Sequence, residues 1–254
     1  MEHAARPAPI DPAMVTAAAA ELEALEFGWE RGPSWLTIES LRIAPGERVF
    51  LSGPSGCGKS TLLALVAGVL QPRRGAIRIA GTPIHRLAAG QRDRFRGAHI
   101  GFIFQMFNLI PYLDVLDNVL LPLRLSQERL ARLGSTPPRD EAWRLLEALG
   151  IAAEARGKRV VAQLSIGQQQ RVAAARALIG SPGLIIADEP TSALDAATRE
   201  EFLRLLTAEC DAAGSALLFV SHDVALGQRF DRALAFASLN RARPSGEQGP
   251  PCRS

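Results

Sequence analysis

Residues 53–60 carry the clearest chemistry in this sequence, because they read Gly-Pro-Ser-Gly-Cys-Gly-Lys-Ser and match the pattern GxxxxGK[ST]. Glycines allow the backbone N–H groups of such a loop to curl around phosphate oxygens, and the N-terminus of a following helix adds partial positive charge. Lys59 would neutralise the outer phosphates of a nucleotide, and the Ser60 hydroxyl would ligate magnesium. The predicted phosphate-binding residues are Gly53, Pro54, Ser55, Gly56, Cys57, Gly58, Lys59, Ser60 and Thr61.

The lysine in this loop is informative because Lys59 and Lys158 are the only lysines among 29 basic residues. A phosphate loop needs a compact ammonium on a flexible stem rather than the planar fork of arginine. The alternative is a glycine-rich turn without chemistry. However, an apolar run at 48–52 precedes the loop and a helical pattern at 61–70 follows it, which is the context that the motif requires.

A second chemical signal is the acidic pair Asp188 and Glu189, which directly follows the apolar run 184–187. Asp188 suits the magnesium side of the phosphate site, and Glu189 could orient and deprotonate a water that attacks the terminal phosphate. Taken alone, such a pair is more often the solvated start of a helix. The phosphate loop in the same chain makes the catalytic interpretation the stronger one.

The segment Leu164-Ser165-Ile166-Gly167-Gln168 resembles the LSGGQ signature of the ABC ATPases, and it lies shortly before the acidic pair, where that family has it. Gln105 resembles the Q-loop glutamine, Ser192-Ala193-Leu194-Asp195 resembles the D-loop, and His222 resembles the switch histidine. Each element alone has an ordinary interpretation; Ser165, for instance, could simply cap a helix. Their occurrence in the family's order, over roughly residues 25–240, identifies the chain as a member of this family.

The resemblance implies a role for each matching residue. The implied catalytic residues are Lys59, Glu189 and His222, and the implied magnesium ligands are Ser60, Gln105 and Asp188. Within the signature and D-loop, the implied ATP-binding residues are Ser165, Gly167, Gln168 and Asp195, which in this family reach the nucleotide held by a second copy. Trp29 matches the position that stacks on adenine, whereas Phe27 is expected to be a core strand residue.

Two residues within these motifs are unusual: one departs from the signature, and the other places a thiol inside the phosphate loop. Ile166 occupies the first glycine position of the signature, and a β-branched residue there requires a right-handed or extended backbone. We expect Ser165 to keep its phosphate-facing role, with an altered affinity or rate. Cys57 lies inside the phosphate loop, and we expect its alkylation to inhibit the ATPase and bound ATP to protect it.

The elements that must position these residues are short apolar runs at 48–52, 76–79, 99–104, 184–187 and 216–220, which are predicted to be strands. Continuous rather than alternating apolar character indicates central strands covered on both faces, hence an α/β core. Apolar residues at helical spacing over 115–133 and 139–149 predict a helical insertion. With the resemblance, the expected fold is a P-loop NTPase (RecA-like) core with an antiparallel β subdomain and a helical ABC-specific subdomain.

The expected domain organisation follows from composition along the chain. A single ATPase domain is expected over 21–240, with the helical subdomain at about 106–180. The Pro- and Ala-rich residues 1–20 and the Pro- and Gly-rich residues 241–254 are expected to be disordered tails. The first of these does not resemble a signal peptide, and Met14 is a candidate for the native start.

Composition excludes several classes of protein. A net charge of +3 from scattered arginines does not predict a nucleic-acid partner, although the pI is about 9.1. The three cysteines have no CxxC spacing, which argues against disulfide and zinc frameworks and fits a reducing cytoplasm. No apolar run approaches the roughly 18 residues of a membrane span, so a membrane role would require a partner chain.

Together these observations predict an ATP- and Mg2+-dependent ATPase subunit that dimerises with a second copy and drives a separate integral membrane permease. The apolar stretch at 104–111 suits docking of a helix from that permease. With 117–123, it resembles the ATPases of lipoprotein-releasing, macrolide-exporting and cell-division systems, which implies the cytoplasmic face of the inner membrane. The alternatives are a soluble ABC ATPase that acts on a ribosome or DNA, for which no second cassette or heptad array is present, and a metabolite kinase.

Overall fold

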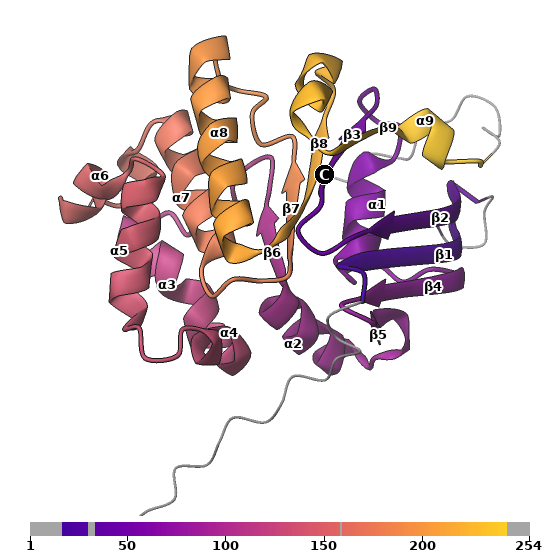
Figure 1. The fold of residues 1–254 in the computed structure, drawn as a ribbon, viewed down its shortest axis with the longest axis horizontal. Coiled ribbons are helices and arrows are strands. Elements are labelled where there is room, and N and C mark those ends of the chain that lie inside the picture. The colour runs from indigo at the N-terminus through magenta and orange to yellow at the C-terminus, as the bar shows by residue number, and fades with distance from the viewer. Residues whose placement is uncertain (1–16, 30–33, 158, 243–254) are drawn as a thin grey trace, which may run out of the picture.

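A parallel β-sheet forms the centre of the molecule in the computed structural model, which describes residues 17–29, 34–157 and 159–242 (Figure 1). Its strand order is β6-β7-β8-β3-β9, with β6 at Ile100–Ile103, β7 at Leu184–Asp188, β8 at Ala216–Ser221, β3 at Arg48–Ser52 and β9 at Arg232–Ala235. The strand predicted at 99–104 is shorter than expected, because the preceding helix α2 (Ala89–His99) extends through His99.

Both faces of this sheet are buried, which explains the continuous apolar runs in the sequence. Along β3, Val49 and Leu51 pack with α1 (Lys59–Val66) on one face, whereas Phe50 packs on the other face with α7 (Ile166–Leu178) and α8 (Ala196–Ala213). A strand covered by helices on both sides can carry no polar face. The predicted α/β core is therefore present.

The carboxyl ends of four parallel strands meet at one edge of the sheet. Ser52 of β3 pairs with Ser221 of β8, Asp188 of β7 pairs with Val220, and Ile103 of β6 pairs with Ala187. The loops that follow these strands therefore open side by side, at the place where ligands of open α/β sheets bind.

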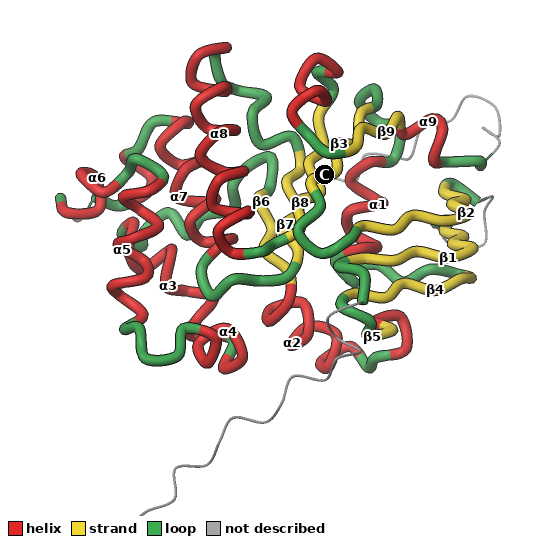
Figure 2. The backbone as a smooth tube through the Cα atoms, in the orientation of Figure 1, coloured by secondary structure: helices red, strands yellow, loops and turns green. Residues whose placement is uncertain are grey.

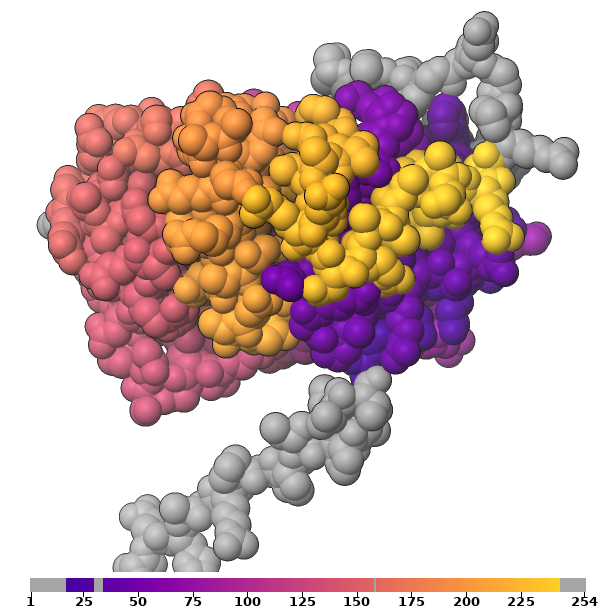
Figure 3. All heavy atoms as spheres, turned by 45° about the horizontal axis from the view of Figure 1, so that its top comes forward, coloured from indigo at the N-terminus to yellow at the C-terminus, as the bar shows by residue number. Residues whose placement is uncertain are grey.

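A second, antiparallel sheet lies beside the core, at the right of Figure 1. Its order is β2-β1-β4-β5, with β2 at Leu36–Ile43, β1 at Ala20–Phe27, β4 at Arg74–Ile79 and β5 at Thr82–Pro83, followed by the turn η2 (Ile84–Arg86). The strand predicted at 76–79 belongs to this sheet rather than to the parallel one. The C-terminal segment, yellow in Figure 3, crosses the N-terminal part of the chain here, and Asn240 bonds the backbone of Thr37 and Trp35.

Helices fill the opposite side of the molecule (Figure 2). They comprise α3 (Val115–Leu125), α4 (Gln127–Arg132), α5 (Pro138–Ala148), α6 (Ala152–Arg156), the turn η3 (Val161–Gln163) and α7. The helical pattern predicted over 115–133 forms two helices, α3 and α4, because Ser126 interrupts it in an extended conformation and its side chain caps α4 by accepting from the N–H of Arg129. An N-cap serine gains a hydrogen bond that a helix interior would deny it.

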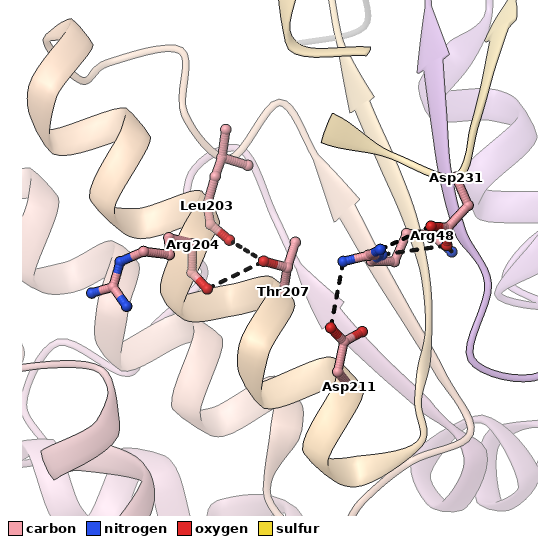
Figure 4. Close-up of polar contacts among 6 residues, drawn as sticks. All are labelled: Arg48, Leu203, Arg204, Thr207, Asp211 and Asp231. Atoms are coloured by element: carbon pink, nitrogen blue, oxygen red, sulfur yellow. Dashed lines mark hydrogen bonds and ion pairs between the residues drawn. The ribbon is translucent and has the colours of Figure 1, made fainter. Parts of the chain in front are cut away.

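A charged cluster joins three elements at the far edge of the parallel sheet (Figure 4). Arg48 at the start of β3 donates a hydrogen bond of 2.8 Å to Asp231 and lies 3.4 Å from Asp211 in the last turn of α8. The bonds from Arg48 hold the pKa of Asp231 below its usual range. Arg48 also offsets the unfavourable position of a carboxylate at a helix C-terminus. Because β3 begins here and the phosphate loop follows its other end, this cluster is structural.

The chain termini differ in part from the expected tails. Residues 1–16 and 243–254 lie outside the described residues. Ala18 and Ala19 are buried and Ala20 begins β1, so the disordered tail expected over 1–20 is wrong for its last residues. At the other end, the Arg241 N–H bonds the Thr37 carbonyl, after η4 (Val224–Arg229), β9 and the short helix α9 (Phe236–Leu239). The ordered chain thus exceeds the expected 21–240 boundaries at both ends.

Candidate nucleotide-binding site

The loop at 53–60 leads from β3 into α1 at the carboxyl edge of the parallel sheet. Gly58 caps the helix at φ 110° and Gly56 lies at φ 77°, a backbone region that favours glycine over residues with a side chain. The first N–H groups of α1 have no partner within their own helix and carry its partial positive charge. The sequence therefore folds here into a loop whose donors are directed toward an anion.

Steric crowding also favours glycine over larger residues at two positions of this loop. A Cβ atom added to Gly53 would lie 3.0 Å from both Cys57 Sγ and Phe236 Cβ, and one on Gly58 would lie 3.2 Å from Phe236 Cζ. Phe236 is buried and reaches the loop from α9, nearly 180 residues later in the chain. Sequence reasoning missed this support, because nothing in the local pattern distinguishes Phe236 from other apolar residues.

Lys59 is held within the loop. Its Nζ donates to the carbonyl oxygens of Gly53 at 2.7 Å and Pro54 at 2.9 Å, and it lies 3.4 Å from Glu189 Oε1. Only 6% of the lysine side chain is exposed, so the ammonium is stabilised by these oxygens rather than by water. The structure thus places the predicted cation beside the predicted base.

Asp188 and Ser60 provide adjacent oxygen donors. Burial raises the pKa of Asp188, a hydrogen bond from Ser60 opposes this shift, and the nearby Glu189 carboxylate adds to it. A carboxylate beside a hydroxyl suits magnesium, which binds few protein oxygens and takes its other ligands from phosphates and water. Gln105, the third predicted ligand, is exposed two residues beyond β6, at the same edge of the sheet.

Glu189 and His222 are brought together from the ends of β7 and β8. His222 Nδ1 lies 2.5 Å from Glu189 Oε2, and the Glu189 N–H bonds the Val220 carbonyl at 3.0 Å. Glu189 adopts φ 46°, a left-handed conformation that costs energy for a residue with a side chain and is often found at functional positions. The imidazole is half exposed, so it can reach a ligand from the solvent side.

Trp29 lies two residues beyond the end of β1. Its ring lies edge-on to Phe27 at 5.1 Å between centroids, and Phe27 is buried while Trp29 is 47% exposed. The prediction that Phe27 is a core strand residue is therefore confirmed. An exposed indole is free to stack on a flat ligand, and adenine stacking by Trp29 stays a prediction.

The signature segment forms the N-terminus of α7 but does not reach the phosphate loop of its own chain. The Ser165 side chain accepts from the Gln168 N–H at 3.3 Å, the Gln168 side chain accepts from the Ser165 N–H at 2.9 Å, and Gln168 also donates to Glu154. Ile166 lies in the first helical turn, as its β-branched side chain requires, and is 53% exposed.

The D-loop packs beside this segment. A Cβ atom on Gly167 would lie 3.6 Å from Leu194 and 3.7 Å from Thr198, which is ordinary packing distance. Asp195 caps α8 by accepting from the Thr198 N–H and hydroxyl, and these bonds lower its pKa. Ser165 and Asp195 are exposed and Gly167 is partly buried between them, so these residues form one surface, separate from the Lys59 site.

A groove of about 780 Å³ leads away from the metal side of the site. Ser60 and Asp188 line one part of it, Asn108 and Arg176 lie along it, and Val69 and Leu125 line another part. Val69 is 60% exposed and Leu125 is 78% exposed. The groove thus connects the acidic residues with an apolar surface between α1 and α3.

Comparison with known proteins agrees with this geometry. A family model described as ABC transporter matches residues 36–192. The chain belongs to the ABC transporter family. It is 43% identical over 204 residues to the uncharacterized ABC transporter ATP-binding protein YbbA of Escherichia coli K12, which covers 79% of this chain and 85% of YbbA. It is 38% identical to the lipoprotein-releasing system ATP-binding protein LolD of Pseudomonas fluorescens, covering 81% and 89%.

A solved ABC cassette has the same fold. The dimeric post-hydrolysis structure of the ATP-binding cassette MJ0796, bound to ADP and Pi, has a TM-score of 0.75 and 34% identity, covering 85% of this chain and 93% of that one. The chain is thus an ABC-type ATPase subunit, and the predicted fold is confirmed. Within the described residues, none of the helices has the length and apolar character needed to cross a bilayer.

Proposed function

We propose that this chain works as a homodimer that closes around two ATP–Mg2+ and thereby drives a membrane permease. The observation that carries the proposal is the separation of the two half-sites within one chain. Lys59, Asp188 and Glu189 are assembled and largely buried, whereas Ser165 and Asp195 are exposed on the signature and D-loop surface. A second copy would supply the missing half, as the dimeric MJ0796 structures suggest by similarity.

In the proposed reaction, Glu189 orients and deprotonates the attacking water, and Lys59 stabilises charge on the terminal phosphate. His222, 2.5 Å from Glu189, keeps that carboxylate in position and can donate to the phosphate. Ser60, Asp188 and Gln105 would hold magnesium, which neutralises charge on the phosphate oxygens. Ser165 and the N-terminus of α7 would add stabilising donors from the partner copy.

The permease is proposed to dock over the groove near Gln105. Exposed apolar side chains gather along this part of the sequence and beside the groove: Val69, Phe104, Met106, Tyr112 and Leu125. Exposed apolar patches of this kind mark interaction surfaces, and an amphipathic helix of a membrane subunit fits such a groove. This arrangement would place the chain at the cytoplasmic face of the inner membrane.

The transport system is proposed to be of the export or lipoprotein-extraction type. This rests on the similarity to LolD and, at 40% identity over 87% of this chain, to the macrolide export ATP-binding/permease protein MacB of Chromobacterium violaceum. The chain spans only 34% of MacB. Copurification of the detergent-solubilised complex tests this assignment: we expect a permease, and recovery of ribosomes or DNA instead would contradict it.

The proposed dimer is tested by Glu189→Gln. The amide keeps the shape of the side chain but cannot accept the proton, so turnover should fall by about 10²–10⁴-fold while ATP stays bound. We expect the variant to elute as a dimer in size-exclusion chromatography with ATP and magnesium, and as a monomer without magnesium. A monomer under both conditions would contradict the proposal.

A further inference from the structure

The segment 104–110, which contains Gln105 and is called here the Gln105 segment, has an unusual backbone. Phe107 and Asn108 are consecutive non-glycine residues in the left-handed region, with φ 58° and 47°. Their N–H groups bond within the turn, to Phe104 O at 2.9 Å and Met106 O at 2.6 Å. Such a conformation persists only where neighbouring groups hold it.

Arg176 of α7 is one of the groups that hold this turn. Its guanidinium donates through Nη1 to the Asn108 carbonyl at 2.7 Å and through Nη2 to the Phe107 carbonyl at 2.6 Å. Both acceptors belong to the two left-handed residues, and the planar fork suits two neighbouring oxygens. Burial lowers the pKa of Arg176, so these carbonyls compensate a cation that is largely removed from water.

A second contact holds the end of the same segment. Asn118 of α3 is fully buried; its Oδ1 accepts from the Ile110 N–H at 2.8 Å, and its Nδ2 donates to the Ile110 carbonyl at 3.1 Å. Asn118 thus fixes residue 110 to α3. Arg176 differs because it fixes the turn nearest Gln105 to α7, the helix that begins with the signature.

We propose that Arg176 is a positioning residue that fastens the Gln105 segment to the signature helix, so that Gln105 and Ser165 move as one body. Helix α7 is rigid enough for this role, since Ser165 and Arg176 lie about 16 Å apart along one uninterrupted helix. Arg176 and Asn108 also line the groove. We call the bonds from Arg176 to the Phe107 and Asn108 carbonyls the clamp. A permease segment docked in the groove presses on the clamp, and helix α7 carries the resulting displacement to Ser165, which meets the partner copy.

The chain offers a matched control for this clamp. Arg132 of α4 also donates from Nη1 to two backbone carbonyls, Ala98 at 2.7 Å and Gly180 at 3.2 Å, and neither belongs to the Gln105 segment. Arg132→Ala therefore removes a similar arginine–carbonyl contact nearby. Effects of Arg176→Ala that Arg132→Ala shares come from general destabilisation.

Hydrogen exchange on the full chain tests the clamp itself. In Arg176→Ala, the amides of 104–110 should exchange about tenfold faster, because the carbonyls of Phe107 and Asn108 lose the two hydrogen bonds that Arg176 donates to them. Arg176→Lys, which keeps the charge but can satisfy only one carbonyl well, should give an intermediate rate, and Arg132→Ala should leave 104–110 unchanged. Unchanged exchange of 104–110 in Arg176→Ala would overturn the proposal.

Kinetics test the coupling, and this part rests on the proposed function. Arg176→Ala should raise the magnesium concentration for half-maximal ATPase activity about fivefold, because Gln105 is displaced, and should lower the Hill coefficient for ATP toward 1, because Ser165 no longer follows it. Arg132→Ala should change neither. Equal shifts in both variants would refute coupling through Arg176, whereas failure of Glu189→Gln to dimerise would refute the proposed function and leave the exchange result standing.

Discussion

The phosphate-loop half and the signature half of this chain differ in how complete they are. Lys59 is 6% exposed and bonded to two carbonyls, and the neighbouring Glu189 is bonded to His222. Ser165 is exposed, and its side chain accepts from the N–H of Gln168 in its own helix. The polar groups of the first half therefore bond to one another, whereas the second half presents the N-terminus of a helix to solvent.

In the proposed dimer, this contrast would place the control of hydrolysis at the signature half. Residues from the ends of β3, β7 and β8 are positioned by the rigid parallel sheet, so the chemistry of the first half needs no rearrangement of strands. The second half lies on helix α7, within the helical region. Under the proposed function, activity depends on bringing the phosphate-loop half of one copy against the signature half of the other.

The largest expected effect concerns Cys57, inside the phosphate loop. A maleimide on its sulfur would fill the tight space near Gly53 and exclude phosphate, so stoichiometric labelling should abolish nearly all ATPase activity, and ATP–Mg2+ should slow the labelling. Cys210 is an internal reference, because burial raises its pKa to about 12 and keeps it unreactive in the folded protein. Peptide mass spectrometry would locate the label.

Cys57→Ser provides the control for this experiment. The hydroxyl is smaller and does not react with maleimide, so the variant should keep its activity after the same treatment. Full activity of a chain that carries one label on Cys57 would show that the loop tolerates a bulky group, and the account of a tightly packed phosphate loop would then be wrong.

A smaller effect is expected for Trp29→Ala. Aromatic stacking contributes about 1 kcal/mol beyond burial, so the Michaelis constant for ATP should rise by roughly 3- to 10-fold. Turnover at saturation should change little, since adenine is bound equally in ground and transition states. Steady-state kinetics check this prediction; Phe27→Leu, a change in the buried neighbour, should lower stability rather than ATP affinity. A fall in turnover with an unchanged Michaelis constant would contradict stacking.

The smallest effect is expected at Ile166 in the signature half. In the proposed dimer, its exposed side chain would face the partner's nucleotide, so Ile166→Gly should raise turnover by about two- to fivefold by removing bulk from that surface. Ile166→Ala separates bulk from backbone freedom, because alanine keeps the helical preference that glycine loses. If steady-state turnover and ATP affinity are unchanged in both variants, this departure from the signature is neutral.

The sequence predicted the parts of the site that depend on local spacing. The loop 53–60 and the acidic pair each follow an apolar strand directly, so backbone geometry fixes their positions once the sheet forms. Phe236 and Arg176 could not be predicted in this way, because their contacts join residues nearly 180 and nearly 70 positions apart. Each is an ordinary residue of its type in its own local pattern.

The wrong expectations also have physical reasons. Apolar periodicity continues across Ser126, so the pattern over 115–133 does not reveal the boundary at which this serine caps a new helix. Burial of Ala18 and Ala19 depends on packing beneath the antiparallel sheet and the Ala19 carbonyl bond to the Ala80 N–H, neither of which alanine-rich composition reveals. Composition gives only the average tendency of a segment to be ordered, whereas pairing with a distant strand determines whether this segment is ordered.

The central claim, that each site is completed by a second copy, is tested most directly by mixing two inactive variants. Lys59→Ala inactivates the phosphate loop, and Ser165→Arg inactivates the signature half. A mixed dimer contains one site with both changes and one intact site. Random assortment should therefore restore ATPase activity to about a quarter of the wild-type value, because half of the dimers are mixed and each has one intact site.

A second mixture distinguishes sites shared between two copies from cooperation between separate sites. A chain that carries both Lys59→Ala and Ser165→Arg should inhibit wild-type protein, because every mixed dimer then lacks an intact site. Sites shared between two copies predict restored activity in the first mixture and inhibition in the second. No gain over the separate variants, together with undiminished wild-type activity, would show that each chain hydrolyses ATP alone and would contradict the account.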